Sequence, residues 1–142
     1  MTVGRFPVAI FVLIAVAGLA MSAQAMLDPI GFLGVLRDVA GADPAAVAAR
    51  DPETARALVF LGRWIATALW GSDGITLLLA LTAFRAGNRW AWWALCYWPV
   101  MFVAHAMLYA PGTTLWYVQF VNLALSVAAL AVADRAIRRA AA

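Results

Sequence analysis

Asp73 is the residue of this sequence whose presence most needs a chemical explanation. It lies in the stretch LWGSDGIT, residues 69–76, within a mostly apolar run from Trp64 to Phe84. An isolated carboxylate at the centre of a bilayer costs several kcal/mol, so its side chain must face other protein groups and either find hydrogen-bond partners or carry a proton. Asp73 is therefore the first candidate for acid–base or ligand chemistry.

Other polar and aromatic residues recur at helical spacing in the apolar parts of the chain. Positions 119, 122 and 126 follow an i, i+3, i+7 pattern, which places them on one face of a helix. Trp98, Met101, His105 and Tyr109 share a second face, and Arg63, Trp70, Asp73 and Thr76 a third. If these faces meet, they form a polar pocket with aromatic walls, whose candidate catalytic residues are Asp73 and His105 and whose candidate ligand-binding residues are Arg63, Trp70, Trp98, Met101, Gln119 and Asn122.

The same residues also fit purely structural roles, and these interpretations stay open. Asp73 would hold the helices together if it bonded to Asn122 or to another polar neighbour. His105 would then be a packing histidine, and Arg63 would lie at the membrane boundary with its guanidinium group in water. The glycines around Ser72 and Asp73 favour a bend in the helix over a binding site.

The remaining composition excludes several kinds of site. One cysteine, Cys96, and one histidine, His105, exclude an internal disulfide, a paired-thiol redox motif and haem held by two histidines of one chain. We therefore expect neither a metal nor a cofactor. The ten basic residues are all arginines at positions that flank apolar segments, so the net charge of +3 does not predict a nucleic-acid partner.

The composition is that of an integral membrane protein. Of the 142 residues, 66% are hydrophobic and 12% charged, whereas soluble domains are about half apolar and about a quarter charged. A membrane-spanning helix needs about 20 mostly apolar residues. The sequence accommodates four such spans, at about 6–25, 57–84, 90–108 and 115–132. It therefore predicts a single all-α membrane domain over residues 1–142, a bundle of four transmembrane helices.

The first span has two interpretations. Arg5 and the small-x-small triplet Ala23-Gln24-Ala25 also fit a secretory signal with its cleavage site. We favour an uncleaved anchor. Either interpretation places residue 26 outside.

The outer connection, residues 26–56, contains three Asp-Pro pairs, at 28–29, 43–44 and 51–52. Each predicts a helix start, because aspartate accepts hydrogen bonds from free N–H groups and proline fits the first helical position. The first pair predicts a short amphipathic surface helix over residues 29–39, with Ile30, Phe32, Leu33 and Leu36 facing lipid or the bundle.

Two of the spans contain features that disturb a straight helix. If residues 52–84 are wholly helical, they extend about 50 Å, which exceeds the roughly 30 Å hydrocarbon core, so this span must tilt, bend or protrude. In the third span, Pro99 leaves the carbonyl near Leu95 without its usual donor.

Arginine positions predict the threading. Arg85 and Arg89 lie in a short turn, and Arg135, Arg138 and Arg139 lie in the C-terminal tail. By the positive-inside rule these regions are cytoplasmic, so both termini face the cytoplasm of the inner, or plasma, membrane. This threading places Asp73 near the bilayer midplane at the level of Asn122, and Arg63, His105 and Gln119 in the outer third.

The segment LGRWIATALWGSDGITLLLALTAFRAG, followed by NRWAWWALCYWPV, resembles small uncharacterised four-span bacterial membrane proteins of the DoxX-like group. The resemblance covers about residues 52–105 and depends mainly on the pattern R-x-G-x-R-W-A-W-W from Arg85 to Trp93. It implies a four-helix bundle and no defined activity.

Three classes of function fit this pattern, and whether the protein is an enzyme stays open. The one we favour is a non-catalytic membrane component that binds a partner protein or a lipophilic ligand within its helix bundle. The second is an enzyme of the isomerase or cyclase type for an isoprenoid- or sterol-like lipid, with Asp73 as proton donor and His105 as its counterpart. The third is a proton-coupled small transporter. The expected partners are membrane lipid, a lipophilic small molecule, and a second copy of the chain or another membrane protein.

Overall fold

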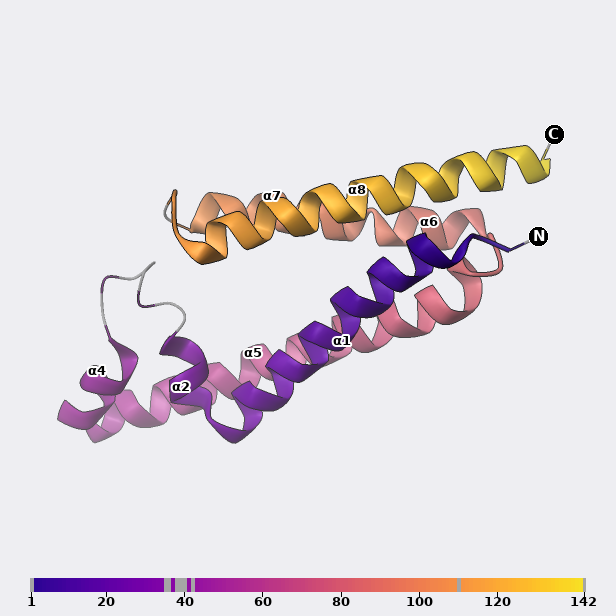
Figure 1. The fold of residues 1–142 in the computed structure, drawn as a ribbon. Coiled ribbons are helices and arrows are strands. Elements are labelled where there is room, and N and C mark those ends of the chain that lie inside the picture. Colours follow the sequence, from indigo (N-terminus) through magenta and orange to yellow (C-terminus); the bar gives the residue numbers. More distant parts are fainter. Residues whose placement is uncertain (1, 35–36, 38–40, 42, 110, 142) are drawn as a thin grey trace. The chain divides into compact units, whose positions relative to one another are not determined.

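The structure is a computed structural model that describes residues 2–34, 37, 41, 43–109 and 111–141. Within these residues the regular secondary structure is entirely helical, with no strand. Four of the described helices are long and apolar enough to cross a membrane (Figure 1): Arg5–Leu27, Pro52–Phe84, Arg89–Leu108 and Thr114–Arg139. The expected all-α membrane fold with four spans is confirmed.

The helices follow the apolar runs of the sequence closely. Their bounds in chain order are α1 Arg5–Leu27, α2 Pro29–Leu33, α4 Pro44–Arg50, α5 Pro52–Leu79, the π-helix η2 Ala80–Phe84, α6 Arg89–Leu95, α7 Tyr97–Leu108 and α8 Thr114–Ala141. Because η2 continues α5 directly, the second candidate span has 33 residues. At about 50 Å it is longer than the hydrocarbon core, so it must tilt, bend or protrude.

All three Asp-Pro pairs of the first connection start helices, as predicted. Each aspartate accepts a hydrogen bond from a backbone N–H group of the helix after it: Asp28 from Gly31 (3.0 Å), Asp43 from Ala45 (3.0 Å) and Asp51 from Glu53 (2.9 Å). Asp51 also accepts from the Thr54 hydroxyl at 2.6 Å. That hydrogen bond is the main reason why the pKa of the Asp51 carboxyl group lies below its usual range.

Two spans depart from regular α-helix, one of them where the sequence predicted. The third span is divided at Cys96 into α6 and α7, because Pro99 cannot donate to the carbonyl of Leu95. In the second span, Gly71–Gly74 stays within α5, and the departure comes later, at η2. Backbone groups in an apolar environment have no alternative partners, so the glycines keep their helical hydrogen bonds.

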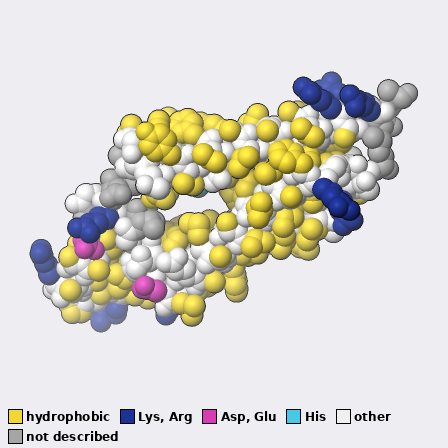
Figure 2. All heavy atoms as spheres, viewed as in Figure 1, with side chains coloured by type: hydrophobic (Ala, Val, Ile, Leu, Met, Phe, Trp, Pro, Cys, Tyr) yellow, Lys and Arg dark blue, Asp and Glu magenta, His cyan; other side chains and the backbone are white. Residues whose placement is uncertain are grey.

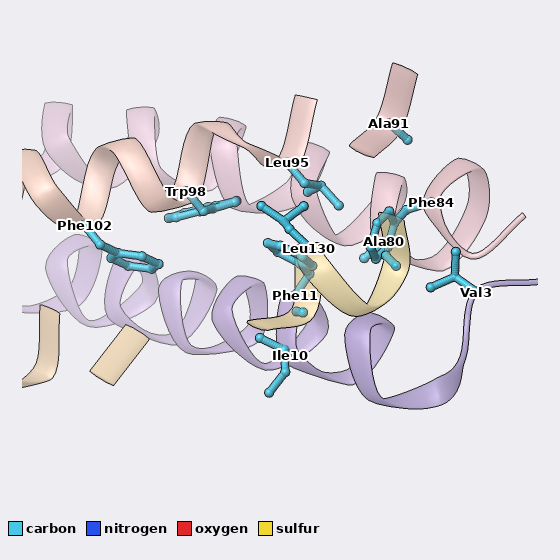
Figure 3. Packing of buried hydrophobic residues seen from close by; sticks show 12 residues of the cluster. Val3, Ile10, Phe11, Ala80, Phe84, Ala91, Leu95, Trp98, Phe102 and Leu130 are labelled. Atoms are coloured by element: carbon cyan, nitrogen blue, oxygen red, sulfur yellow. The ribbon is translucent and has the colours of Figure 1, made fainter. Parts of the chain in front are cut away.

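The chain divides into two compact units: a first unit of Met1–Val16 with Gly74–Ala142, and a second unit of Ala17–Asp73. The expected single membrane domain stays a prediction. The core of the first unit centres on Phe11 and Phe84, whose rings meet edge to face at 5.5 Å. Leu95 and Leu130 pack around them (Figure 3). The start of α1 is thereby packed against η2.

Within the first unit, polar contacts join α6 to α8. Arg89 forms an ion pair with Asp134, which also pairs with Arg138 at 2.7 Å. The indole N–H of Trp92 donates to the carbonyl of Leu130 at 2.8 Å, and the Arg89 guanidinium group lies 5.0 Å from the centre of the Trp92 ring. These contacts fix the end of the span that carries the RWAWW sequence.

The second unit has its own small core, formed by Ala25, Phe32, Leu33 and Ala66. Phe32 and Leu33 of α2 are buried there, at 7% and 1% exposure, so they face protein rather than lipid. The described helix α2 ends at Leu33. Positions 35, 36, 38 and 39, including Leu36, lie outside the described residues, so the predicted extent of this helix to residue 39 stays a prediction.

Hydrophobic side chains cover much of the visible face along the helices, and arginine side chains lie close to both chain termini (Figure 2). Large apolar residues such as Phe60, Leu78 and Val100 are 66–72% exposed. An exposed apolar surface along helices of this length is typical of contact with lipid.

Candidate functional site

Asp73 is buried against the backbone of α1. It is 1% exposed, and a Cβ atom added to Gly18 would lie 2.1 Å from Asp73 Oδ2 and 2.4 Å from its Cγ. These distances are far shorter than van der Waals contact, so the carboxyl group fills the space that any larger residue at position 18 would need. Gly18 therefore makes room for Asp73.

Ser22 lies one helical turn beyond Gly18 and is fully buried. Its hydroxyl group donates to the carbonyl of Gly18 at 2.8 Å, so its proton is used within α1. Gly18 and Ser22 form a pair of small residues four apart, which lets two membrane helices approach closely. This pair was not among the predicted site residues, although the i, i+4 spacing of small residues in the first span indicates it.

Neither carboxylate oxygen of Asp73 has a hydrogen-bond partner among the described residues. Buried polar groups in proteins nearly always have one, and the hydrocarbon core of a bilayer offers no water in its place. The bond expected between Asp73 and Asn122 would join the two units and stays a prediction. Asp73 thus has unused hydrogen-bonding capacity in an apolar segment.

Trp98, a predicted ligand-binding residue, takes part in a buried hydrogen bond. Its indole N–H donates to the hydroxyl of Thr76 at 2.9 Å. Its ring centre lies 5.6 Å from that of Phe102. The predicted polar faces of the second and third spans therefore meet at this point. Because the only donor of Trp98 is already used there, its ring can supply an apolar wall but no hydrogen bond to a ligand.

The predicted polar face of α8 is turned inward. Gln119 is 8% exposed and Ser126 is fully buried, while Asn122 is half-buried. Met101 and His105 on α7, which packs along α8, are also half-buried. The His105 ring centre lies 6.4 Å from that of Tyr109. The spacing of the polar residues thus predicted the buried face correctly.

The third predicted face, on α5, is divided. Arg63 and Trp70 are exposed, Trp70 at 51%, whereas Asp73 and Thr76 are buried. At about 100° per residue these four positions spread over about 140° of the helix surface. The face is therefore too wide for all four side chains to point into one pocket.

The described residues contain no group of three His, Cys, Asp or Glu side chains that could hold a metal ion. No family model, curated protein or solved structure matches the chain, and the resemblance to the DoxX-like group stays a prediction. The fold defines the class: the chain is a small polytopic helical membrane protein.

Proposed function

We propose that the protein is a non-catalytic membrane component that binds a lipophilic molecule among its helices, with Asp73 as the polar contact. The observation that carries this proposal is the Asp73 carboxyl group, which is 1% exposed within a candidate span and has no hydrogen-bond partner among the described residues. A hydroxyl or amine group on an otherwise apolar ligand supplies the missing donor. In hydrocarbon such a bond forms without competition from water.

The surroundings of Asp73 favour a small ligand over a partner helix at this position. The carboxyl group lies directly on the backbone of α1 at Gly18. A side chain from another protein would reach it only if α1 separated from α5 there. A single hydroxyl or amine group needs much less room, so the ligand is the better match.

Ligand retention tests the role of Asp73. Native mass spectrometry of detergent-purified protein should find an apolar molecule with a hydrogen-bond donor on the wild type. Asp73→Ala should retain at least tenfold less of it, because the acceptor is gone. Thr67→Ala is the matched control, since Thr67 lies on the same helix and its hydroxyl donates to the carbonyl of Arg63 at 2.9 Å. Equal retention by all three proteins would rule out Asp73 as the contact.

Asp73→Asn distinguishes binding from proton chemistry. Asparagine keeps the size and one acceptor oxygen of aspartate, but its amide group does not gain or lose a proton near neutral pH. If the protein only binds, retention by Asp73→Asn should stay within a few-fold of wild type. A proton flux in proteoliposomes that disappears in this variant would instead favour the transporter. Conversion of the bound lipid that requires both Asp73 and His105 would favour the enzyme.

We also propose that both termini face the cytoplasm of the plasma membrane. The support is the positive-inside rule, because Arg85 and Arg89 flank one turn and Arg135, Arg138 and Arg139 come after the last apolar run.

A further inference from the structure

A pocket of about 300 Å³ lies within the first unit, at the beginning of α1. It is lined by Val3, Arg5, Val8, Ala9, Val12 and Arg85. Four of these six residues are aliphatic, and the other two are the arginines at the start of the first candidate span and directly after the end of the second. The pocket therefore combines an apolar wall with two cations at the level of a membrane boundary.

Packing and hydrogen bonding hold the two sides of this pocket together. The backbone N–H group of Val3 donates to the carbonyl of Arg85 at 2.9 Å. Further along α1, the ring of Phe11 meets that of Phe84 in η2 edge to face at 5.5 Å. Arg5 and Arg85 are thus brought to one place by a fixed backbone, although they are 80 residues apart in the sequence.

The two arginines of the pocket differ from their neighbours in charge pairing. Arg89 and Arg138 share the carboxylate of Asp134. In the part of the chain that the structure describes, neither Arg5 nor Arg85 forms an ion pair. The first turn of α1 contains no acidic residue, so its free N–H groups add to the positive potential. The pocket carries uncompensated positive charge.

We propose that this pocket binds one anionic phospholipid, with its phosphate between Arg5 and Arg85 and an acyl chain along Val8 and Val12. The guanidinium group is the side chain best suited to a phosphate, which it binds through paired hydrogen bonds. Val8 and Val12 lie one and two helical turns further into the span, in the direction that an acyl chain takes from its headgroup. The amphiphilic lining fits a lipid better than it fits a free anion.

Lipid titration of the full chain tests this proposal. Detergent-purified protein is titrated with phosphatidylglycerol and, separately, with phosphatidylcholine, and the lipid-bound fraction is measured by native mass spectrometry. Wild type should prefer phosphatidylglycerol. Arg5→Gln/Arg85→Gln should weaken phosphatidylglycerol binding roughly 30-fold, because it removes the attraction of two arginines for an anionic lipid. Arg135→Gln/Arg139→Gln lowers the net charge equally and should leave binding within a few-fold of wild type.

A second variant keeps both arginines. It therefore tests the pocket itself, without changing the net charge or the arginine pattern that determines membrane orientation. In Ala9→Trp the larger side chain should fill the space beside the apolar wall and weaken phosphatidylglycerol binding at least tenfold. Unchanged helix content by circular dichroism should show that the variant is folded. Equal weakening in the two arginine pairs would show diffuse attraction and overturn the proposal, as would equal affinity of wild type for the two lipids. Normal binding by a folded Ala9→Trp protein would also overturn it.

Discussion

At the scale of single residues, the closest contact of functional interest joins a glycine and an acid. Asp73 occupies the volume beside Gly18 that a methyl group would take. A carboxyl group in this position without a partner among the described residues lowers stability. Such a cost is typical of a residue retained for its chemistry rather than for folding.

Gly18→Ala should therefore lower the stability of the protein by about 1–3 kcal/mol, because the added methyl group overlaps the carboxyl group. In an Asp73→Ala background the same change should be neutral or stabilising, since the space is then free and alanine favours helix. The measurement is unfolding by sodium dodecyl sulfate in mixed micelles, monitored by circular dichroism, for the two single variants and the double variant. Strictly additive effects in this cycle would show that the two residues are not in contact.

At the scale of elements, helix starts and packing contacts have different origins. The Asp-Pro pairs and Pro99 act through their own backbone geometry, and so their effects were predicted from the sequence. The packing of α2 on α5 depends on residues that are far apart in sequence. A Cβ atom on Gly62 would lie 2.7 Å from Cβ and 3.1 Å from the carbonyl oxygen of Pro29.

Gly62→Ala should consequently destabilise the second unit by about 1–3 kcal/mol, because proline and its backbone cannot easily move aside. Gly71→Ala is the matched control on the same helix, since a Cβ atom there has nothing within 4 Å. We expect that control to be neutral or slightly stabilising. Protease resistance of residues 26–56 and the unfolding midpoint in detergent report both effects. If the two substitutions lower the stability by the same amount, the contact between α2 and α5 is not the cause of the destabilisation.

The sequence predicted the elements better than it predicted their contacts. Apolar runs, Asp-Pro pairs and Pro99 each provided a local signal, and these signals were enough to place the four spans. The burial of Asp73 was also expected, because a carboxylate avoids lipid. Its neighbour was not, because the spacing of Gly18 and Ser22 indicates a close approach of two helices but not which residue of the other helix lies there. For Arg5 and Arg85 the sequence likewise indicated only their charge. Their shared pocket could not be predicted, because it forms when segments 80 residues apart in the sequence pack together.

At the scale of the whole molecule, the even number of candidate spans has a direct consequence for the termini. Four crossings return the chain to the side on which it started. In the orientation proposed above from the arginine distribution, that side is the cytoplasm. The connection that contains α4 is then outside, and the turn between η2 and α6 is inside.

Cysteine labelling of intact cells should reproduce this threading. In a Cys96→Ala background, Ala45→Cys on the exposed surface of α4 should react with a membrane-impermeant maleimide. Ala86→Cys, which is also exposed but lies in the turn after η2, should react only after the cells are opened. The reverse pattern would place both termini outside, and labelling of both sites in intact cells would contradict a unique orientation.

The π-helix η2 also sets the helical phase of the residues that come after it. A π-helical turn accommodates one more residue than an α-helical turn, so the later positions are rotated by about 100° from where a continuing α-helix would put them. Arg85 comes directly after η2, and its carbonyl accepts a hydrogen bond from the N–H group of Val3. The place of Arg85 beside Arg5 in the lining of the pocket therefore depends on this π-helical turn. A chain one residue shorter between Ala80 and Phe84 would keep its span and its charges, yet present that arginine to a different side.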